Sequence, residues 1–147
     1  FDECNEWRLY HGTSLAASHG ICATNFRLSL SGTGATWKEE GAEKGSPLYG
    51  FGIYLGESIT KSDEYAGETE DGLNVMLICR AVGGRTNVCE TNEIDKQKLK
   101  DDVFNGSYHS VFGDRVAKLG KPYRELVLYD KDQIFPEFLV HYERRYD

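Results

Sequence analysis

The sequence predicts a single α+β domain that spans residues 1–147. Short runs of alternating or continuous apolar residues, bounded by Gly, Pro, Asn and Asp, outnumber the segments with helical periodicity. The 147 residues are 39% hydrophobic and 12% aromatic, which is enough apolar material for one compact core. Strands and helices that are segregated in this way along a short chain are typical of the α+β class.

The elements can be assigned in order along the chain. We expect strands at 7–12, 25–30, 49–56, 74–82, 124–130 and 137–145. Helices are expected at 13–22, with Thr13 or Ser14 as the N-cap, at 58–67, between Ser58 and Gly67, and at 93–104. The segments 31–47 and 105–123 are predicted to be loops, and the first is long enough to be a candidate functional loop.

Charge and hydropathy exclude two classes of partner. The formal net charge is -7, whereas proteins that bind a phosphate backbone unaided are normally basic, so we expect no strong intrinsic nucleic-acid binding. No run approaches the 18 apolar residues of a membrane span, so no membrane association is expected. The first residue is Phe1 rather than Met, and we therefore expect a piece or a processed form of a longer chain.

The four cysteines and four histidines do not form a metal-binding pattern. Cys4, Cys22, Cys79 and Cys89 include no C-x-x-C pair and the histidines are scattered, so no metal is predicted. Cys79 and Cys89 flank "RAVGGRTNV", which could form a hairpin and bring the two thiols together. Disulfides would fit a secreted protein, but buried free thiols in the nucleus or cytoplasm are the simpler interpretation.

The stretch "YGFGIYLG" at 49–56 is an unusual strand. With a two-residue period its faces are Phe51, Ile53 and Leu55 on one side and Gly50, Gly52, Tyr54 and Gly56 on the other. The first face reads as core, and the second is cleared of side chains around one tyrosine. Glycine inside a strand marks close approach by a ligand or by another backbone. The stretch is therefore either a shelf for a flat ligand or a bulge or tight crossing of two sheets.

Polar groups on inward faces add three further candidates. His11 ends a strand beside Gly12, where it can contact a ligand or bond a core carbonyl. In the 58–67 helix, Ser62 and Tyr65 lie on one stripe, either as ligand contacts or as filler at the core edge. Glu125 shares a strand face with Val127 and Tyr129. Burying a carboxylate on such a face costs free energy unless it is paired with a cation or has a function, and the alternative is that Glu125 lies at a solvated strand end.

Three motifs together resemble the catalytic domain of the poly(ADP-ribose) polymerase family. They are "LYHGT", "GFGIYLGESITKSDEYA" and "YRELVLYDKDQIFPEFLVHY", and the resemblance runs from about residue 7 to 143. "YHSVFG" and "PEFLVHY" are most similar to the tankyrase members. The tankyrase zinc-binding loop has no match, and neither has the helical regulatory domain that precedes the catalytic domain in some members. The resemblance implies a diphtheria-toxin-like fold with two antiparallel sheets around an NAD cleft and flanking helices.

The resemblance also implies a role for each candidate residue. Nicotinamide would lie between Tyr65 and Tyr54, with its carboxamide bonded to the Gly12 backbone and the Ser62 hydroxyl, while the glycines keep room for it. His11 would hold the adenine-side ribose and Arg27 would meet the phosphates or the adenine end. The 31–47 loop would cover the donor. Thr13 and Lys61 lie inside the same motifs and belong to the implied NAD site.

Glu125 would carry the chemistry of this family, together with His11 and Tyr54. Cleavage of the nicotinamide–ribose bond develops positive charge on the ribose, which a carboxylate stabilises more in the transition state than in the ground state. The chain would thus be an ADP-ribosyltransferase that consumes NAD as a substrate and passes ADP-ribose to a protein or nucleic-acid acceptor, once or repeatedly. No dinucleotide-binding G-x-G-x-x-G before a helix is found, and none is needed.

Three other classes remain as alternatives at this point. RNA 2'-phosphotransferases share a His-Gly-Thr opening but rely on further His and Arg residues rather than a glutamate, which Glu125 and the acidic composition disfavour. A catalytically silent NAD or ADP-ribose binding module would usually lack one of His11, Tyr54 and Glu125, and all three are present. A plain interaction domain would have to carry four coincident motifs by chance.

Overall fold

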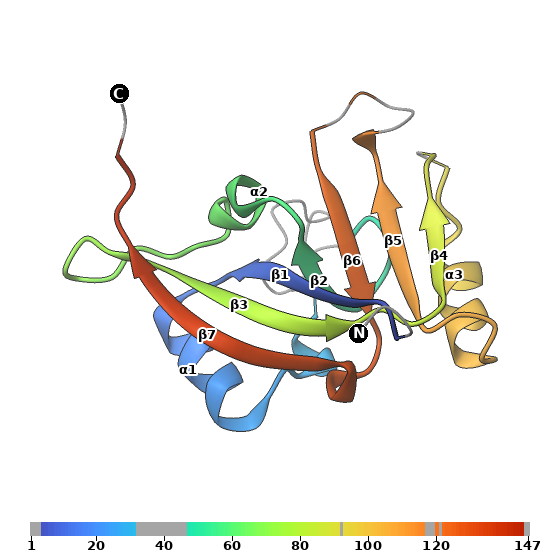
Figure 1. Cartoon of the computed structure of the whole chain (residues 1–147), viewed down its shortest axis with the longest axis horizontal. Coiled ribbons are helices and arrows are strands. Elements are labelled where there is room, and N and C mark those ends of the chain that lie inside the picture. Colours follow the sequence, from blue (N-terminus) through green and yellow to red (C-terminus); the bar gives the residue numbers. More distant parts are fainter. Residues whose placement is uncertain (1–3, 32–46, 92, 117–119, 121, 146–147) are drawn as a thin grey trace, which may run out of the picture.

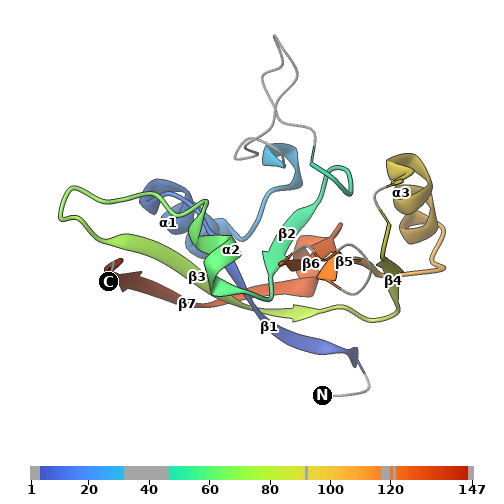
Figure 2. The ribbon, with the colours of Figure 1, turned by 90° about the horizontal axis from the view of Figure 1, so that it is seen from above.

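The computed structural model describes residues 4–31, 47–91, 93–116, 120 and 122–145 as one α+β arrangement, which confirms the predicted class (Figures 1 and 2). The strands are β1 (Glu6–Gly12), β2 (Ile53–Gly56), β3 (Asn74–Val82), β4 (Thr86–Cys89), β5 (Ser110–Asp114), β6 (Arg124–Leu128) and β7 (Ile134–Tyr142). The helices are α1 (Leu15–Thr24), α2 (Ile59–Asp63) and α3 (Lys96–Phe104), with short 3-10 turns at Leu28–Leu30 and Lys131–Gln133. Apart from its two ends, the predicted 31–47 loop lies outside the described residues.

The expectation of two separate antiparallel sheets is wrong. The seven strands form one sheet in the order β4-β5-β6-β2-β1-β3-β7, and β4 runs parallel to β5. The physical reason is a single residue pair, Tyr10 with Gly56, which joins β1 to β2 and makes two half-sheets continuous. Figure 1 shows that β1, β3 and β7 on one side of this junction run in a clearly different direction from β6, β5 and β4 on the other.

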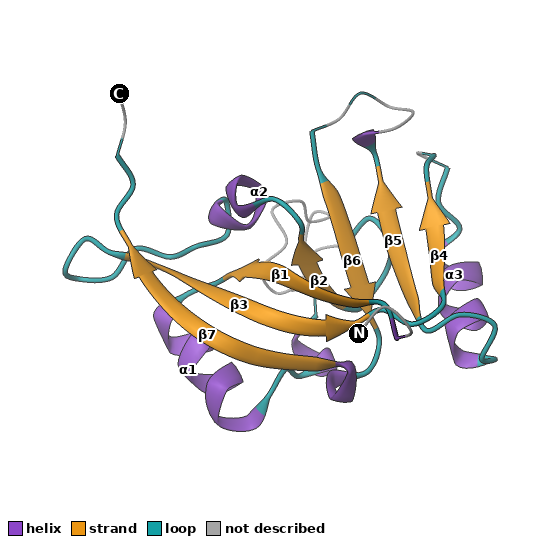
Figure 3. Ribbon diagram, viewed as in Figure 1, coloured by secondary structure: helices purple, strands orange, loops and turns teal. Residues whose placement is uncertain are grey.

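Each face of the sheet buries its own hydrophobic cluster. On one face Leu9, Leu55 and Leu77 pack with Leu126 and Leu128. On the other face the buried residues are Tyr49, Leu99, Val111, Val127 and Tyr129, with Tyr54 packed against them. Helix α3 contributes Leu99 to this second cluster, and Figure 3 shows it beside the β4 end of the sheet. The alternation along β6 therefore sends leucines to one cluster and Val127 and Tyr129 to the other.

Several element predictions are confirmed and two are wrong. Helix α1 follows Ser14, whose hydroxyl accepts from the Ala17 amide at 3.2 Å, and β3 spans the predicted 74–82. The 25–30 segment is not a strand, because Asn25 takes a φ of 65° and its side-chain amide donates to the carbonyls of Lys131 and Ile134, at the 3-10 turn just before β7. The predicted loop 105–123 contains β5, which lies in the middle of one half-sheet.

The strand predicted at 49–56 is also shorter than expected, and the position over Gly52 is not open space. Strand β2 begins at Ile53, and Gly50 lies in a turn with a φ of 85°. A Cβ on Gly52 would lie 2.6 Å from Val127 Cγ1, so the chain's own packing needs this glycine. Phe51, assigned to the core from the sequence, is 59% exposed. Close packing of Gly52 against the neighbouring strand β6 therefore accounts for this glycine.

The cysteines lie apart. Strand β4 pairs with β5 rather than with β3, so "RAVGGRTNV" is not a hairpin and does not bring Cys79 to Cys89. Cys79 is fully buried in the first cluster, Cys89 packs beside the second, and all four cysteines are free thiols. Among the described residues, no helix is long and apolar enough to cross a membrane.

Candidate active site

Strands β1 and β2 separate just beyond the Tyr10–Gly56 pair, and His11 lies at this split. Its ring points to the leucine face, where it meets Phe26 edge-on at 5.0 Å between ring centroids. The His11 Nδ1 lies 3.0 Å from the carbonyl oxygen of Tyr54. A carbonyl can only accept, so Nδ1 carries the proton and the neutral ring presents Nε2 as an acceptor. Burial lowers the pKa of His11 below 6.5, which keeps the ring neutral near pH 7.

Glu125 stands in a row of four directly opposed residues on neighbouring strands. The row runs Tyr10, Gly56, Glu125 and Gly113 across β1, β2, β6 and β5. Directly opposed residues share a face, and Tyr54, two residues before Gly56, lies on that face too. Tyr54 and Glu125 are therefore diagonal neighbours, a spacing of roughly 7–8 Å. Glu125 is flanked on both sides by residues that have no side chain.

Helix α2 packs its Ser62 against both strands at the split. The Ser62 hydroxyl donates to the Tyr10 carbonyl at 3.0 Å, and a Cβ on Gly56 would lie 2.7 Å from that hydroxyl. A Cβ on Gly12 would overlap the Ser62 carbonyl. Ser62 is 5% exposed, so this contact is part of the folded interior. The two glycines thus admit the helix itself, and at Gly56 the space expected for a ligand is occupied by Ser62.

The backbone of Gly12 lies at the edge of β1 just beyond this contact. The Tyr54 carbonyl points toward β1, since it contacts His11, and the Tyr10 carbonyl points toward Ser62. Backbone groups two residues apart on a strand point to the same edge, so the Gly12 amide and carbonyl face the side where β2 pairing has ended. A planar amide that lies at this edge can donate to the Gly12 carbonyl and accept from its amide.

Lys61 of α2 lies near two aromatic rings and Glu64, and its charge acts on Glu125. Its ammonium lies 5.1 Å from the Tyr65 ring centre and 5.4 Å from that of Tyr123, and donates to Glu64 at 2.7 Å. Burial raises the pKa of Glu125 above 4.5, while the charges of Lys61 and Arg115 partly oppose that rise. A carboxylate with a raised pKa on a face that carries two aromatic rings is typical of a functional group rather than of a solvated strand end.

Helix α2 is only five residues long, and the last strand holds it in place. The Arg144 guanidinium donates to the Asp63 carboxylate at 2.9 Å and to the Asp63 carbonyl at 2.8 Å. The Tyr142 hydroxyl also donates to the Asp63 carboxylate. The helix predicted at 58–67 is shorter than expected, and Ile59 at its start is 51% exposed. Arg144 was not found from the sequence, because nothing in "HYERRYD" indicates which helix its cation meets.

Not every predicted residue joins this group. Arg27 is exposed and makes one long contact, 3.4 Å to the Thr24 hydroxyl, and Thr13 contributes a carbonyl that accepts from the Gly67 amide. Three residues beside Glu125 were missed, namely Tyr49, Arg115 and Tyr123. Arg115 and Tyr123 lie within the 105–123 segment that was predicted to be a loop, and Tyr49 was predicted to start a strand.

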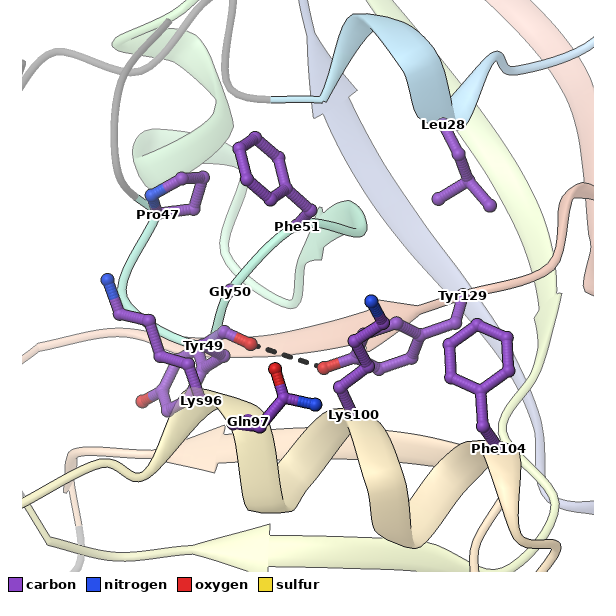
Figure 4. A pocket seen from close by; sticks show the side chains of 10 residues that line it. All are labelled: Leu28, Pro47, Tyr49, Gly50, Phe51, Lys96, Gln97, Lys100, Phe104 and Tyr129. Atoms are coloured by element: carbon purple, nitrogen blue, oxygen red, sulfur yellow. Dashed lines mark hydrogen bonds between the residues drawn. The ribbon is translucent and has the colours of Figure 1, made fainter.

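A cavity among the described residues lies away from this group. It holds about 350 Å³ between the 47–51 turn and α3, with Phe51, Lys100 and Phe104 around it (Figure 4). Its lining includes Tyr49 but not His11, Ser62, Tyr65 or Glu125. In the described part of the chain no group of three His, Cys, Asp or Glu side chains could hold a metal ion.

Substituting Gly12 tests the contact between β1 and α2. We expect Gly12→Ala to lower the free energy of unfolding by about 1–3 kcal/mol or more, because the new Cβ meets the Ser62 backbone and not a flexible side chain. Gly20→Ala is the matched control, since Gly20 lies inside α1 with nothing within 4 Å. It should raise stability by up to about 1 kcal/mol. Urea unfolding of the three proteins distinguishes these outcomes, and two equal changes would contradict the packing described.

The half-buried, neutral His11 makes the free energy of unfolding depend on pH. Folding lowers the pKa of His11, so the folded state favours the neutral ring. The contribution of His11 to the free energy of unfolding is therefore fully present above the unfolded pKa of 6.5 and is lost as the pH falls through the folded pKa. We expect urea unfolding to report lower stability at pH 5.5 than at pH 7.5, and His11→Gln to lose part of that difference. His19, exposed on α1, supplies the control His19→Gln. Identical pH dependence in wild type and His11→Gln would refute the assignment.

Comparison with known proteins identifies the family of this chain. Residues 2–113 match the family described as the poly(ADP-ribose) polymerase catalytic domain. The matched range includes His11, Tyr54 and Tyr65 and ends before Glu125. The chain is 36% identical over 100 residues, 66% of its length, to "Poly [ADP-ribose] polymerase tankyrase" of Caenorhabditis elegans, of which these residues are 4%.

Two longer alignments reach Glu125. The chain is 26% identical over 140 residues, 95% of its length, to "Protein mono-ADP-ribosyltransferase PARP12" of Mus musculus, and 23% identical over 141 residues, 94% of its length, to the protein of that name in Homo sapiens. It spans 17% of each of these relatives. With a family match over most of its residues, the chain belongs to the poly(ADP-ribose) polymerase catalytic domain family.

Proposed function

We propose that this domain is an NAD-dependent ADP-ribosyltransferase that cleaves the nicotinamide–ribose bond of NAD and transfers ADP-ribose to a protein acceptor. The observation that carries the proposal is Glu125, a half-buried carboxylate on the same sheet face as Tyr54, whose pKa is raised by desolvation and partly lowered by the charge of Lys61. The Ser62 hydroxyl lies over Gly56, the residue directly opposite Glu125. Family membership supports NAD as the substrate.

The nicotinamide end of NAD binds at the split between β1 and β2. Its carboxamide pairs with the free edge of Gly12, and the Ser62 oxygen, whose proton is given to Tyr10, accepts from the amide nitrogen. The Tyr65 ring, which lies in the turn after α2, supplies the flat surface on which the pyridinium stacks. A positively charged ring over an aromatic face is favourable in itself.

His11 contacts the adenine-side ribose from the other side of the split. Its Nδ1 proton is committed to the Tyr54 carbonyl, so Nε2 accepts from a ribose hydroxyl. The same hydrogen bond ties the position of His11 to the backbone of Tyr54, the residue that faces the nicotinamide. Arg27 and Thr13 extend the proposed site toward the phosphates, and Arg27 is exposed and able to reach an anion.

Glu125 acts when the glycosidic bond breaks. As nicotinamide leaves as a neutral base, positive charge develops on its ribose, and an ionised Glu125 that accepts from a ribose hydroxyl stabilises that charge. The carboxylate also orients the acceptor oxygen or nitrogen, which attacks the cationic carbon and then loses its proton. Lys61 favours the ionised form of Glu125.

Labelled NAD tests this proposal. We expect the domain to release nicotinamide and to attach label to protein, and separation of the products by size would show whether one or many ADP-ribose units are added. An NAD-binding domain that releases no nicotinamide would instead be the catalytically silent module considered above. An absence of NAD binding in calorimetry would contradict both functions.

A further inference from the structure

A buried phenol, that of Tyr49, lies close to Glu125. Tyr49 is 0% exposed, and its hydroxyl has no hydrogen-bond partner among the described residues. The rest of the residue is firmly placed, since its amide donates to the Tyr54 hydroxyl at 3.0 Å and its carbonyl accepts from Tyr129 at 3.2 Å. Figure 4 shows the Tyr129 contact and the Tyr49 ring on the sheet side of the cavity. A buried donor without a partner costs free energy and needs a reason.

The strand register places this hydroxyl beside Glu125. Gly113 lies directly opposite Glu125, and a Cβ on Gly113 would overlap the hydroxyl end of the Tyr49 ring. Opposed Cβ positions on paired strands are about 4.5–5.5 Å apart, so the Tyr49 hydroxyl lies on the order of 5 Å from the Glu125 Cβ. That is within the reach of a glutamate side chain after one rotamer change.

Glu125 therefore lies between two hydroxyls, each admitted by a glycine. The Ser62 hydroxyl fills the space over Gly56 and has already given its proton to Tyr10. The Tyr49 hydroxyl fills the space over Gly113, and its proton has no acceptor among the described residues. Arg115 lies nearby, since its charge lowers the pKa of both Glu125 and Tyr49, and its Nε is a buried donor without a partner in the described part of the chain.

We propose that Tyr49 is a positioning residue, which donates a hydrogen bond from its hydroxyl to the ionised Glu125 carboxylate and holds it against the substrate ribose. This role rests on the proposed transferase function. The bond satisfies a buried donor, and it favours the charged form of the carboxylate, the form that the reaction needs. Arg115 adds a positive charge to the same side. Burial of Tyr49 keeps its own proton in place, because it raises the pKa of the phenol to about 12.

The test is a titration of Glu125 that needs no turnover. In protein with carbon-13 in the glutamate carboxyls, the Glu125 resonance is the one missing from Glu125→Gln. We expect Tyr49→Phe to raise the Glu125 pKa by about one unit, because a hydrogen bond to the charged form is lost. The matched control Tyr129→Phe, which removes a neighbouring buried phenol oxygen but leaves the Tyr49 hydroxyl, should leave the Glu125 pKa within a few tenths of the wild-type value.

The wild type supplies a second measurement that depends on no variant. The Tyr49 carbon that bears the hydroxyl should shift with the same midpoint as Glu125. Among kinetic constants, Tyr49→Phe should lower kcat about tenfold with little change in KM for NAD. An unchanged Glu125 pKa in Tyr49→Phe, an equal rise in Tyr129→Phe, or a Tyr49 carbon that does not respond to Glu125 would each overturn the inference. A wild type that titrates as expected but consumes no NAD would contradict the proposed function instead.

Discussion

Glu125→Gln is expected to cut ADP-ribose transfer on the order of a hundredfold or more while NAD binding stays close to wild type. Losing one electrostatic group that acts in the transition state has effects of this size. Glutamine keeps the length of the side chain and a hydrogen-bond acceptor, so the β6 face should keep its shape. The negative charge is lost, and that charge matters only once the ribose becomes cationic.

Calorimetry of NAD binding beside turnover of labelled NAD checks this prediction. Glu137→Gln is a suitable control, because Glu137 lies on β7 and pairs with the exposed Arg8 at 3.0 Å, away from the row that contains Glu125. It should leave both binding and turnover unchanged. Equal loss of affinity and activity in Glu125→Gln would make Glu125 a ground-state binding residue, and full activity would make it a passive strand-end charge.

Tyr65→Ala should weaken the binding of nicotinamide, of benzamide-like competitors and of NAD itself. Losing one aromatic stacking surface costs about 1–3 kcal/mol, which is roughly five- to 150-fold in Kd. Tyr65→Phe should keep most of the affinity because the stacking surface remains, and competition experiments with benzamide measure the series. Phe104→Ala serves as the control, since it removes an aromatic ring from the α3 cavity and leaves α2 untouched. Unchanged affinity in Tyr65→Ala would contradict the stacking role.

The parts of the fold that follow local rules could be predicted from the sequence. The Ser14 cap, the apolar run of β3 and the alternation along β6 each depend on neighbouring residues, and each is confirmed. The faces on which His11 and Glu125 lie were also predicted, because the two-residue period of a strand fixes them. Family membership, inferred from "LYHGT" and the stretch around Tyr54, is confirmed by the match over 2–113.

What could not be predicted depends on pairing between distant segments. One residue pair, Tyr10 with Gly56, decides between one sheet and two, and no local pattern reveals it. The glycines of the second motif looked like space for a ligand, yet Val127 and Ser62 fill that space, and both come from other elements. Tyr49 was assigned to a strand because the turn at Gly50, with its φ of 85°, has no clear sequence signal in "LYGFG".

The most direct test of this account is a crystal structure of the domain with benzamide bound. We predict that the amide bonds the Gly12 backbone and the Ser62 hydroxyl at the split between β1 and β2, with the ring against Tyr65 and Glu125 on the neighbouring strand face. The 350 Å³ cavity between the 47–51 turn and α3 is the competing place, since its aromatic lining would also accept a flat ring. Benzamide bound only in that cavity, with the Gly12 edge free, would contradict the proposed site.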